Sequence, residues 1–260
     1  MEGFWDGRDF PESFIKDVTS TKSSRIVGGG IVSPPHSIPF QVALFITAGG
    51  GNFMCGGSVI SNTRTLTAAH CIIGTINTNI RFGSHNFNGV DGGEVRHTVP
   101  SGNYRVHPNY NPSNLNNDIA VMINPFVGYT ANIQPVLRAS GGDQFAGVTA
   151  TMSGWGGIVG GGTSEPLRAA SNTVITNAAC AAVYGTSTVF AGVICTNTNI
   201  SGPNGGTCGG DSGGPLFIGS GGSRTQIGVT AFVAGAGCTA GFPAGFARMT
   251  HYAAWINSHM

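Results

Sequence analysis

The sequence predicts an all-β protein whose single helix lies at the C-terminal end. Glycine accounts for 43 of the 260 residues, about twice its usual share. Short runs rich in Val, Ile, Thr and Phe alternate with clusters of Gly, Asn, Ser and Pro, which is typical of many short strands joined by tight turns. Only residues 249–258 have the spacing of an amphipathic helix, with Tyr252, Trp255 and Ile256 on one face.

Four segments carry the clearest strand pattern, and the breaks between segments are predicted loops. Apolar and β-branched residues dominate the four strands, which are residues 39–46, 58–60, 118–123 and 148–153. Proline and asparagine concentrate at 108–117, so a surface loop is expected to lead into the third strand. The glycine-rich tracts at 47–52, 156–163 and 219–223 are predicted to be exposed loops.

Composition excludes several classes of function. The formal net charge is +1 and only 9% of the residues are charged, so the chain lacks the electrostatic footprint of a protein that binds nucleic acid or an anionic membrane. No apolar stretch reaches the length of a membrane span. No secretory apolar segment follows Met1, and we expect that a signal peptide has been removed or replaced by an expression start.

Cysteine usage indicates an oxidising compartment. Six cysteines without a metal-type CxxC spacing favour three disulfides, although the sequence alone leaves their pairing open. Residues 1–25 contrast with the rest, because they hold five of the 11 acidic residues, both lysines and no cysteine. We expect these residues to form a solvated, detachable arm, since no disulfide can hold it after cleavage.

Three separated motifs supply the groups that acyl-transfer catalysis needs. Ser212 lies in the run GGDSGG, whose glycines let the backbone come close to a reacting carbonyl. His70, in TAAHC, and Asp118, in NDIA, each border an apolar run. The three residues offer a nucleophile, a general base and a carboxylate that orients the base.

The run GDSGG also satisfies the G-x-S-x-G pattern of α/β-hydrolases. Those enzymes place their triad in the order Ser, acid, His on alternating strands and helices. Here the order is His, Asp, Ser and almost no helix is predicted, so we reject this interpretation.

Together with RIVGG at 25–29 and SGWG at 153–156, these motifs make the chain resemble the chymotrypsin-fold serine proteases, the trypsin/chymotrypsin family, over residues 26–260. GVTAF at 228–232 and GAGC at 235–238 are similar to insect digestive chymotrypsins and arthropod collagenolytic proteases. The resemblance implies two antiparallel six-stranded β-barrels with the active site in the cleft between them, followed by a C-terminal helix. The implied divisions are an activation propeptide (1–25) and a protease domain (26–260), with barrels at about 26–133 and 134–245 and a helix at about 249–258.

The resemblance also assigns roles to the catalytic residues. His70, Asp118 and Ser212 would form the triad, in which His70 is the general base and Asp118 orients it. The backbone N–H groups of Gly210 and Ser212 would form the oxyanion hole. Six cysteines would pair as Cys55–Cys71, Cys180–Cys195 and Cys208–Cys238.

The motif RIVGG at 25–29, at the end of the arm, implies that cleavage activates the protein. Cleavage after Arg25 would create an ammonium group on Ile26, which in this family pairs with the carboxylate matching Asp211. Because a buried carboxylate without a partner is costly, this pairing can drive ordering of the oxyanion loop.

The predicted specificity pocket carries no charge. The resemblance places Gly206 at the base of the pocket, where a trypsin-like enzyme would have an aspartate, with Thr207 beside it. It places Val233 and Ala244 on the walls of the pocket. Chymotrypsins carry glycine at both wall positions and elastases carry larger residues. We therefore predict chymotrypsin- or elastase-like cleavage after Leu, Met, Ala or Val, with Phe or Tyr tolerated.

Two residues depart from the family pattern. Ala231 stands where a serine usually hydrogen-bonds the triad aspartate. Ser84 stands where trypsins begin their calcium loop with a glutamate, and only Asp91 and Glu94 lie nearby, so we expect no metal site and no other cofactor. Asn199 begins a glycosylation sequon.

These features predict a secreted, monomeric zymogen of a digestive endopeptidase. Its partners would be protein or peptide substrates, a trypsin-like activating protease and protein protease inhibitors. Every basic side chain after Arg25 is arginine, which stays charged at higher pH than lysine, so we predict an alkaline fluid such as an insect gut lumen. A regulatory protease with a narrow target, and a catalytically weak homologue acting as a binding protein, are the alternatives.

Overall fold

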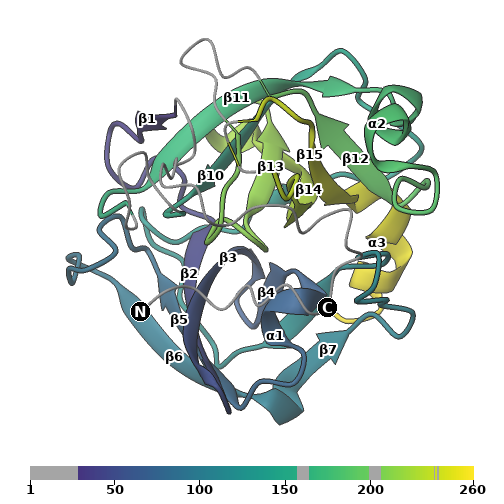
Figure 1. The fold of residues 1–260 in the computed structure, drawn as a ribbon. Coiled ribbons are helices and arrows are strands. Elements are labelled where there is room, and N and C mark those ends of the chain that lie inside the picture. The colour runs from purple at the N-terminus through teal and green to yellow at the C-terminus, as the bar shows by residue number, and fades with distance from the viewer. Residues whose placement is uncertain (1–28, 157–163, 199–205, 237, 239) are drawn as a thin grey trace.

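The computed structural model of this chain describes residues 29–156, 164–198, 206–236, 238 and 240–260. The described strands form two sheets, one from the first half of the chain and the other mainly from the second half (Figure 1). The predicted all-β fold class with a C-terminal helix is confirmed. Among the described residues, no helix has the length and apolar character that crossing a membrane requires.

The first sheet is antiparallel and curls around its own core, in the spatial order β6-β5-β2-β3-β4-β8-β7. β2 and β3 form a long hairpin that pairs residues 41–48 with residues 58–51, and the apolar side chains of β2 are almost all buried. Among the described residues no pairing joins β6 to β7, so this sheet is curled but open. Its strands are β2 (Gln41–Ala48), β3 (Gly51–Ser61), β4 (Arg64–Thr67), β5 (Asn77–Phe82), β6 (Val95–Pro100), β7 (Tyr104–Val106) and β8 (Ala120–Ile123).

The second sheet closes into a barrel. Its spatial order is β1-β11-β10-β13-β14-β15-β12, and pairing of β12 with β11 completes the ring, while β9 adds a short parallel pairing with β14. Its strands are β1 (Gly30–Ile31), β9 (Leu137–Arg138), β10 (Thr149–Gly154), β11 (Arg168–Ile175), β12 (Val193–Thr196), β13 (Pro215–Ile218), β14 (Thr225–Phe232) and β15 (Ala244–Arg248).

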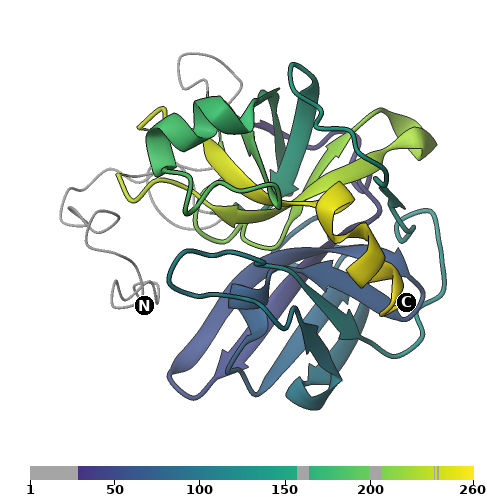
Figure 2. The same cartoon turned by 90° about the vertical axis from the view of Figure 1, so that its right-hand side faces the viewer.

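In the described part of the chain, three α-helices accompany the sheets: α1 (Ala69–Ile72), α2 (Asn177–Tyr184) and α3 (Met249–Asn257). α3 matches the predicted C-terminal helix and buries Met249, Tyr252 and Ile256. Figure 2 shows the two sheets one above the other with α3 along one side. α3 follows directly from β15 of the second sheet, and its Tyr252 ring packs against His107, just after β7 of the first sheet, so α3 bridges the two halves.

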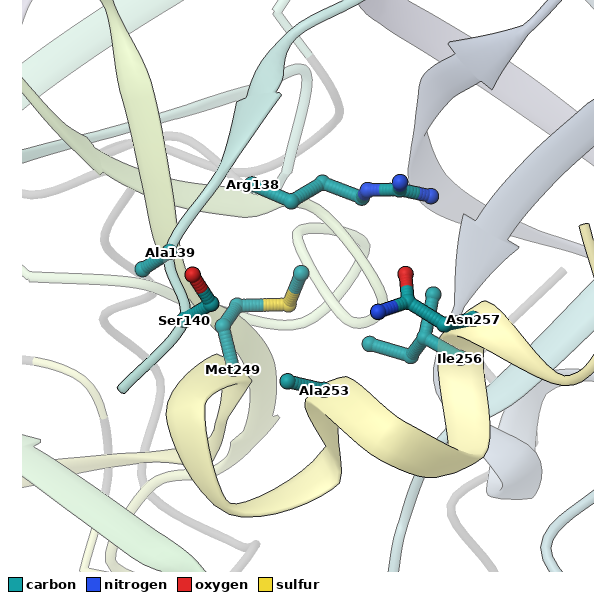
Figure 3. A pocket seen from close by; sticks show the side chains of 7 residues that line it. All are labelled: Arg138, Ala139, Ser140, Met249, Ala253, Ile256 and Asn257. Atoms are coloured by element: carbon teal, nitrogen blue, oxygen red, sulfur yellow. The ribbon is translucent and has the colours of Figure 1, made fainter. Parts of the chain in front are cut away.

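A cavity of about 120 Å³ lies between β9 and α3 (Figure 3). Apolar side chains of α3 form its floor and the Arg138 side chain lies across it. None of its lining residues belongs to the catalytic motifs, so it is separate from the predicted site. The lining residues are Arg138, Ala139, Ser140, Met249, Ala253, Ile256 and Asn257.

Candidate active site

Two neighbouring strands of the first sheet bring His70 and Asp118 together. β4 pairs with β8 so that Thr67 lies opposite Ala120, and α1 follows β4 while Asp118 precedes β8. His70 Nδ1 lies 2.6 Å from Asp118 Oδ2, and the backbone N–H of His70 donates to Asp118 Oδ1 at 2.9 Å. Asp118 is only 1% exposed. This carboxylate fixes the imidazole orientation and leaves Nε2 as the nitrogen able to accept a proton.

Ser212 lies in a turn just before β13 of the second sheet, against the segment that leads into His70. The backbone N–H of Gly56, on β3, donates to the Ser212 carbonyl oxygen at 2.7 Å. Gly213 has a φ of +76°, and a Cβ there would overlap Thr67 Oγ1 and lie 3.1 Å from Ala68 N. Glycine after the serine therefore allows the two sheets to meet where the base and the nucleophile are carried.

Gly210 satisfies two separate demands that exclude other residues. Its φ is +95°, and a Cβ there would lie 3.0 Å from Gly156 Cα and 3.2 Å from Met54 Cε. Both the backbone conformation and the close packing require glycine. The assignment of the Gly210 and Ser212 N–H groups to an oxyanion hole stays a prediction.

The Asp211 carboxylate is buried beneath this turn. Its oxygens accept hydrogen bonds from the backbone N–H groups of Gly156 and Cys208, both at 2.9 Å. Burial raises the pKa of Asp211 to about 7, although these two hydrogen bonds act in the opposite direction. Its predicted partner Ile26 lies outside the described residues, as do Arg25 and the Asn199 sequon.

The four predicted pocket residues come from segments that the structure holds together. Thr207 and Ala244 are buried, and Val233 is partly buried against the core. Ala244 on β15 lies opposite Thr196 on β12, and a Cβ on Gly206 would lie 3.0 Å from the Thr198 side chain. These described neighbours are uncharged.

Three disulfides brace the site. Cys55–Cys71 joins β3 to α1 next to His70, Cys180–Cys195 joins α2 to β12, and Cys208–Cys238 joins the segment before Asp211 to the one after Val233. Cys55, His70 and Cys71 also lie close enough together to suggest a metal site. Because the two sulfurs are bonded to each other and His70 is held by Asp118, this group does not fit a metal ion.

One buried apolar cluster near Asp118 was not predicted from the sequence. Leu115, three residues before Asp118, is 7% exposed despite lying in the polar loop 108–117, and it belongs to one buried cluster with Val189, Ala231 and Phe232. The only signal in the sequence was a single leucine among Pro, Asn and Ser. Ala231, which stands where the family usually has a serine that hydrogen-bonds the triad aspartate, is buried. The hydrogen bonds described for the Asp118 carboxylate come from His70 instead.

One sheet leads into His70, hydrogen-bonded to Asp118, and the other sheet carries Ser212 just before β13; these are the groups that a β-sheet hydrolase with a serine nucleophile needs. The trypsin family model matches residues 27–256. Brachyurin of Leptuca pugilator is 40% identical over 233 residues, covering 88% of this chain and 96% of brachyurin. Chymotrypsin of Phaedon cochleariae is 36% identical over 245 residues, covering 91% of this chain and 83% of that protein.

A solved structure of HL collagenase agrees with this relationship, with a TM-score of 0.80 and 33% identity over 90% of this chain and 97% of the collagenase. The chain therefore belongs to the trypsin family of serine proteases and has the chymotrypsin fold. It is a serine endopeptidase, homologous to brachyurin, collagenase and chymotrypsin.

Proposed function

We propose that this chain is the secreted zymogen of a digestive serine endopeptidase that cleaves after uncharged, mainly apolar residues. The observation that carries the specificity is Gly206 at the predicted pocket base, beside the buried Thr207. A cationic substrate side chain would lose its hydration there without gaining a carboxylate, which disfavours Lys and Arg.

The proposed reaction uses the three predicted triad residues. Ser212 Oγ attacks the scissile carbonyl while His70 Nε2 takes the hydroxyl proton, and the imidazolium then gives that proton to the leaving amine. A water molecule, deprotonated in turn by His70, hydrolyses the acyl-enzyme and regenerates Ser212. Asp118 stabilises the imidazolium through its 2.6 Å contact with Nδ1. The N–H groups of Gly210 and Ser212 stabilise the oxyanion.

Activation would follow cleavage after Arg25 by a trypsin-like protease. The Ile26 ammonium would then pair with the Asp211 carboxylate, whose burial makes an ionic partner valuable. The arm contains no cysteine and so leaves after cleavage. Three disulfides support an extracellular location, and arginine in place of lysine after residue 25 supports an alkaline one.

The test is to process the chain with trypsin, inhibit the trypsin selectively, and compare substrates that differ only in the residue before the cut. We expect cleavage after Leu, Met, Ala or Phe and none in the matched Ser212→Ala chain. Val233→Gly should widen the pocket and raise the ratio of Phe to Ala cleavage by about tenfold.

Each other outcome contradicts a defined part of the proposal. Cleavage after Arg or Lys would overturn the pocket assignment. Inactivity of a chain whose N-terminus is verified as Ile26 would favour a binding protein. Full activity of an uncleavable Arg25→Gln chain would overturn the zymogen mechanism.

A further inference from the structure

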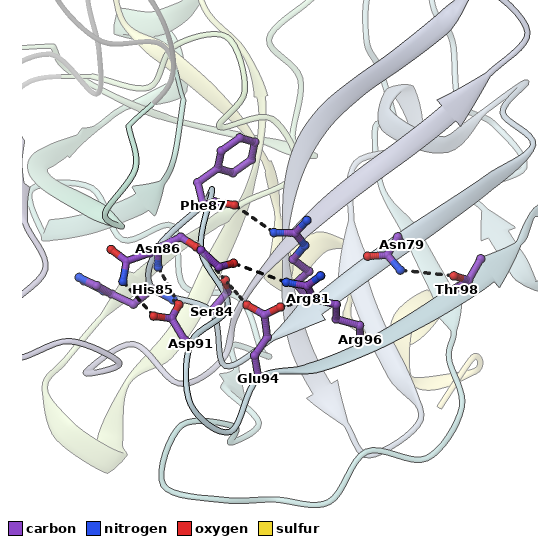
Figure 4. A network of polar contacts seen from close by, with 11 residues as sticks. Asn79, Arg81, Ser84, His85, Asn86, Phe87, Asp91, Glu94, Arg96 and Thr98 are labelled. Carbon is purple, nitrogen blue, oxygen red and sulfur yellow. Dashed lines mark hydrogen bonds and ion pairs between the residues drawn. The ribbon is translucent and has the colours of Figure 1, made fainter.

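The loop between β5 and β6 is organised around the Asp91 carboxylate (Figure 4). Asp91 Oδ2 accepts the backbone N–H groups of His85, at 2.5 Å, and Asn86, at 2.7 Å. Oδ1 accepts Asn86 Nδ2 at 2.9 Å. Burial acts to raise the pKa of Asp91, but these hydrogen bonds outweigh burial and hold that pKa below its usual value.

The second carboxylate of this loop is also occupied by donors. Glu94 Oε2 accepts the Ser84 hydroxyl at 2.8 Å, and Oε1 forms an ion pair with Arg96. The Glu94 side chain is 0% exposed. Calcium takes about six to eight oxygen ligands, whereas here N–H and O–H groups point at the carboxylate oxygens. The residues present therefore do not fit the calcium ion that trypsins hold in this loop.

From Asp91 a short series of hydrogen bonds leads to the catalytic turn. His85, whose N–H donates to Asp91, accepts Trp155 Nε1 at its carbonyl oxygen at 2.9 Å. Trp155 is 1% exposed. The next residue, Gly156, donates its backbone N–H to Asp211, which precedes Ser212. The loop carboxylate is thus connected to the residue that orders the oxyanion segment.

We infer that Asp91 is a positioning residue. Its carboxylate organises this loop by accepting the loop's own N–H groups, whereas trypsins organise the loop around a bound calcium ion. In this way Asp91 holds Trp155 and Gly156 against Asp211. This inference rests on the proposed roles of Asp211 and Ser212. Because the donors belong to the chain itself, the alignment of the oxyanion segment is independent of calcium. Asn is a poor replacement for Asp91, since it carries no charge and its one oxygen can serve only the two backbone N–H groups, so that the Asn86 amide must turn over to stay paired.

The test uses the processed chain and two readouts. Trp5 leaves with the arm, so Trp255→Phe makes Trp155 the sole tryptophan and its emission reports the contact with His85. Asp91→Asn should lower kcat about tenfold with a smaller change in KM, and should shift the Trp155 emission to the red. Asp143→Asn is the matched control, because Asp143 also accepts a backbone N–H but lies in another loop.

Wild-type kcat and Tm should be the same in EDTA and in millimolar calcium, and a loss of either in EDTA would overturn the inference. Unchanged kcat and emission in Asp91→Asn would also overturn it. If Asp91→Asn does not fold, Asn86→Ala removes only the side-chain donor and should produce a smaller change in the same direction. An inactive wild type would contradict the proposed function, while the emission shift would still test the role of Asp91.

Discussion

Asp211 is surrounded by backbone that leaves no room for side chains. A Cβ on Gly154 would overlap Asp211 Oδ1, and one on Gly156 would lie 2.5 Å from Oδ2. The N–H groups of Gly156 and Cys208 can therefore reach a carboxylate on a residue that is only 1% exposed. Close backbone approach explains why small residues are needed on both sides of Trp155.

We predict that Gly156→Ala inactivates the processed enzyme. The methyl group would displace Asp211 and remove the alignment of Ser212, so kcat/KM should fall by ~10²-fold or more. Gly142→Ala is the control, because nothing lies within 4 Å of a Cβ there. Active-site titration and peptide hydrolysis would measure the loss, and Gly156→Ala activity within threefold of wild type would contradict the expectation.

The roles of some site residues can be predicted from the sequence, and those of others cannot. Ser212, His70 and Asp118 sit in local motifs whose residue types reveal their chemistry. Leu115 could not be found in this way, because its burial depends on Phe232, more than a hundred positions away, and its φ is +55°. The hydrogen bond from Trp155 to His85 is invisible for the same reason, since it joins segments 70 positions apart.

Among the secondary-structure elements, strands were more predictable than short helices. β2, β8 and β10 overlap the predicted segments because alternating or continuous apolar residues mark buried strands. α2 was not predicted. It is only eight residues long, and its capping contact, from Ala179 N to Thr176 Oγ1 at 3.2 Å, is a local detail that composition does not reveal. The parallel pairing of β9 with β14 is likewise a long-range contact.

For α2 we predict that Thr176→Ala lowers the free energy of unfolding by about 1 kcal/mol, since the first turn loses its side-chain acceptor. The measurement is guanidinium unfolding of the intact chain carrying Ser212→Ala, which prevents self-digestion. Thr186→Ala changes an exposed threonine beyond the helix and should have little effect. Equal destabilisation by both substitutions would rule out a capping role.

In the whole molecule, two buried polar pairs fix how the sheets meet. The Ser58 hydroxyl donates to Gln226 Oε1 at 2.7 Å, and the Ser153 hydroxyl donates to Gln41 Oε1 at 2.6 Å. Each pair joins the first sheet to the second, and burial makes an unmatched partner costly. The arrangement of two sheets came from the family resemblance, because no local pattern in the sequence encodes which strands become neighbours.

The stability of the whole chain should depend on pH differently before and after cleavage at Arg25. In the intact chain the pKa of Asp211 is raised to about 7, so the folded state holds a proton that the unfolded state loses near pH ~4. The contribution of the Asp211 carboxyl to the free energy of unfolding is therefore fully present below pH ~4 and is lost as pH rises toward about 7. In the processed chain the proposed pairing with the Ile26 ammonium would keep Asp211 ionised and remove that loss.

Processing should therefore stabilise the chain more at pH 7 than at pH 5, by up to about 1.4 kcal/mol per pH unit. The free energies of unfolding of the intact and processed chains, both carrying Ser212→Ala, measure this difference. Contributions from other titrating groups cancel in the comparison when processing leaves their pKa values unchanged. Trypsin-treated Arg25→Gln should behave as the intact chain. A pH-independent difference would show that Ile26 and Asp211 do not pair.

The division of the predicted triad between the two sheets also matters during synthesis. His70 and Asp118 leave the ribosome well before Ser212, and the Gly56 N–H that meets the Ser212 carbonyl lies in the first sheet. A chain interrupted anywhere before residue 212 holds a base without a nucleophile. Partial translation products and early termination fragments therefore lack the predicted nucleophile, whatever the state of the arm.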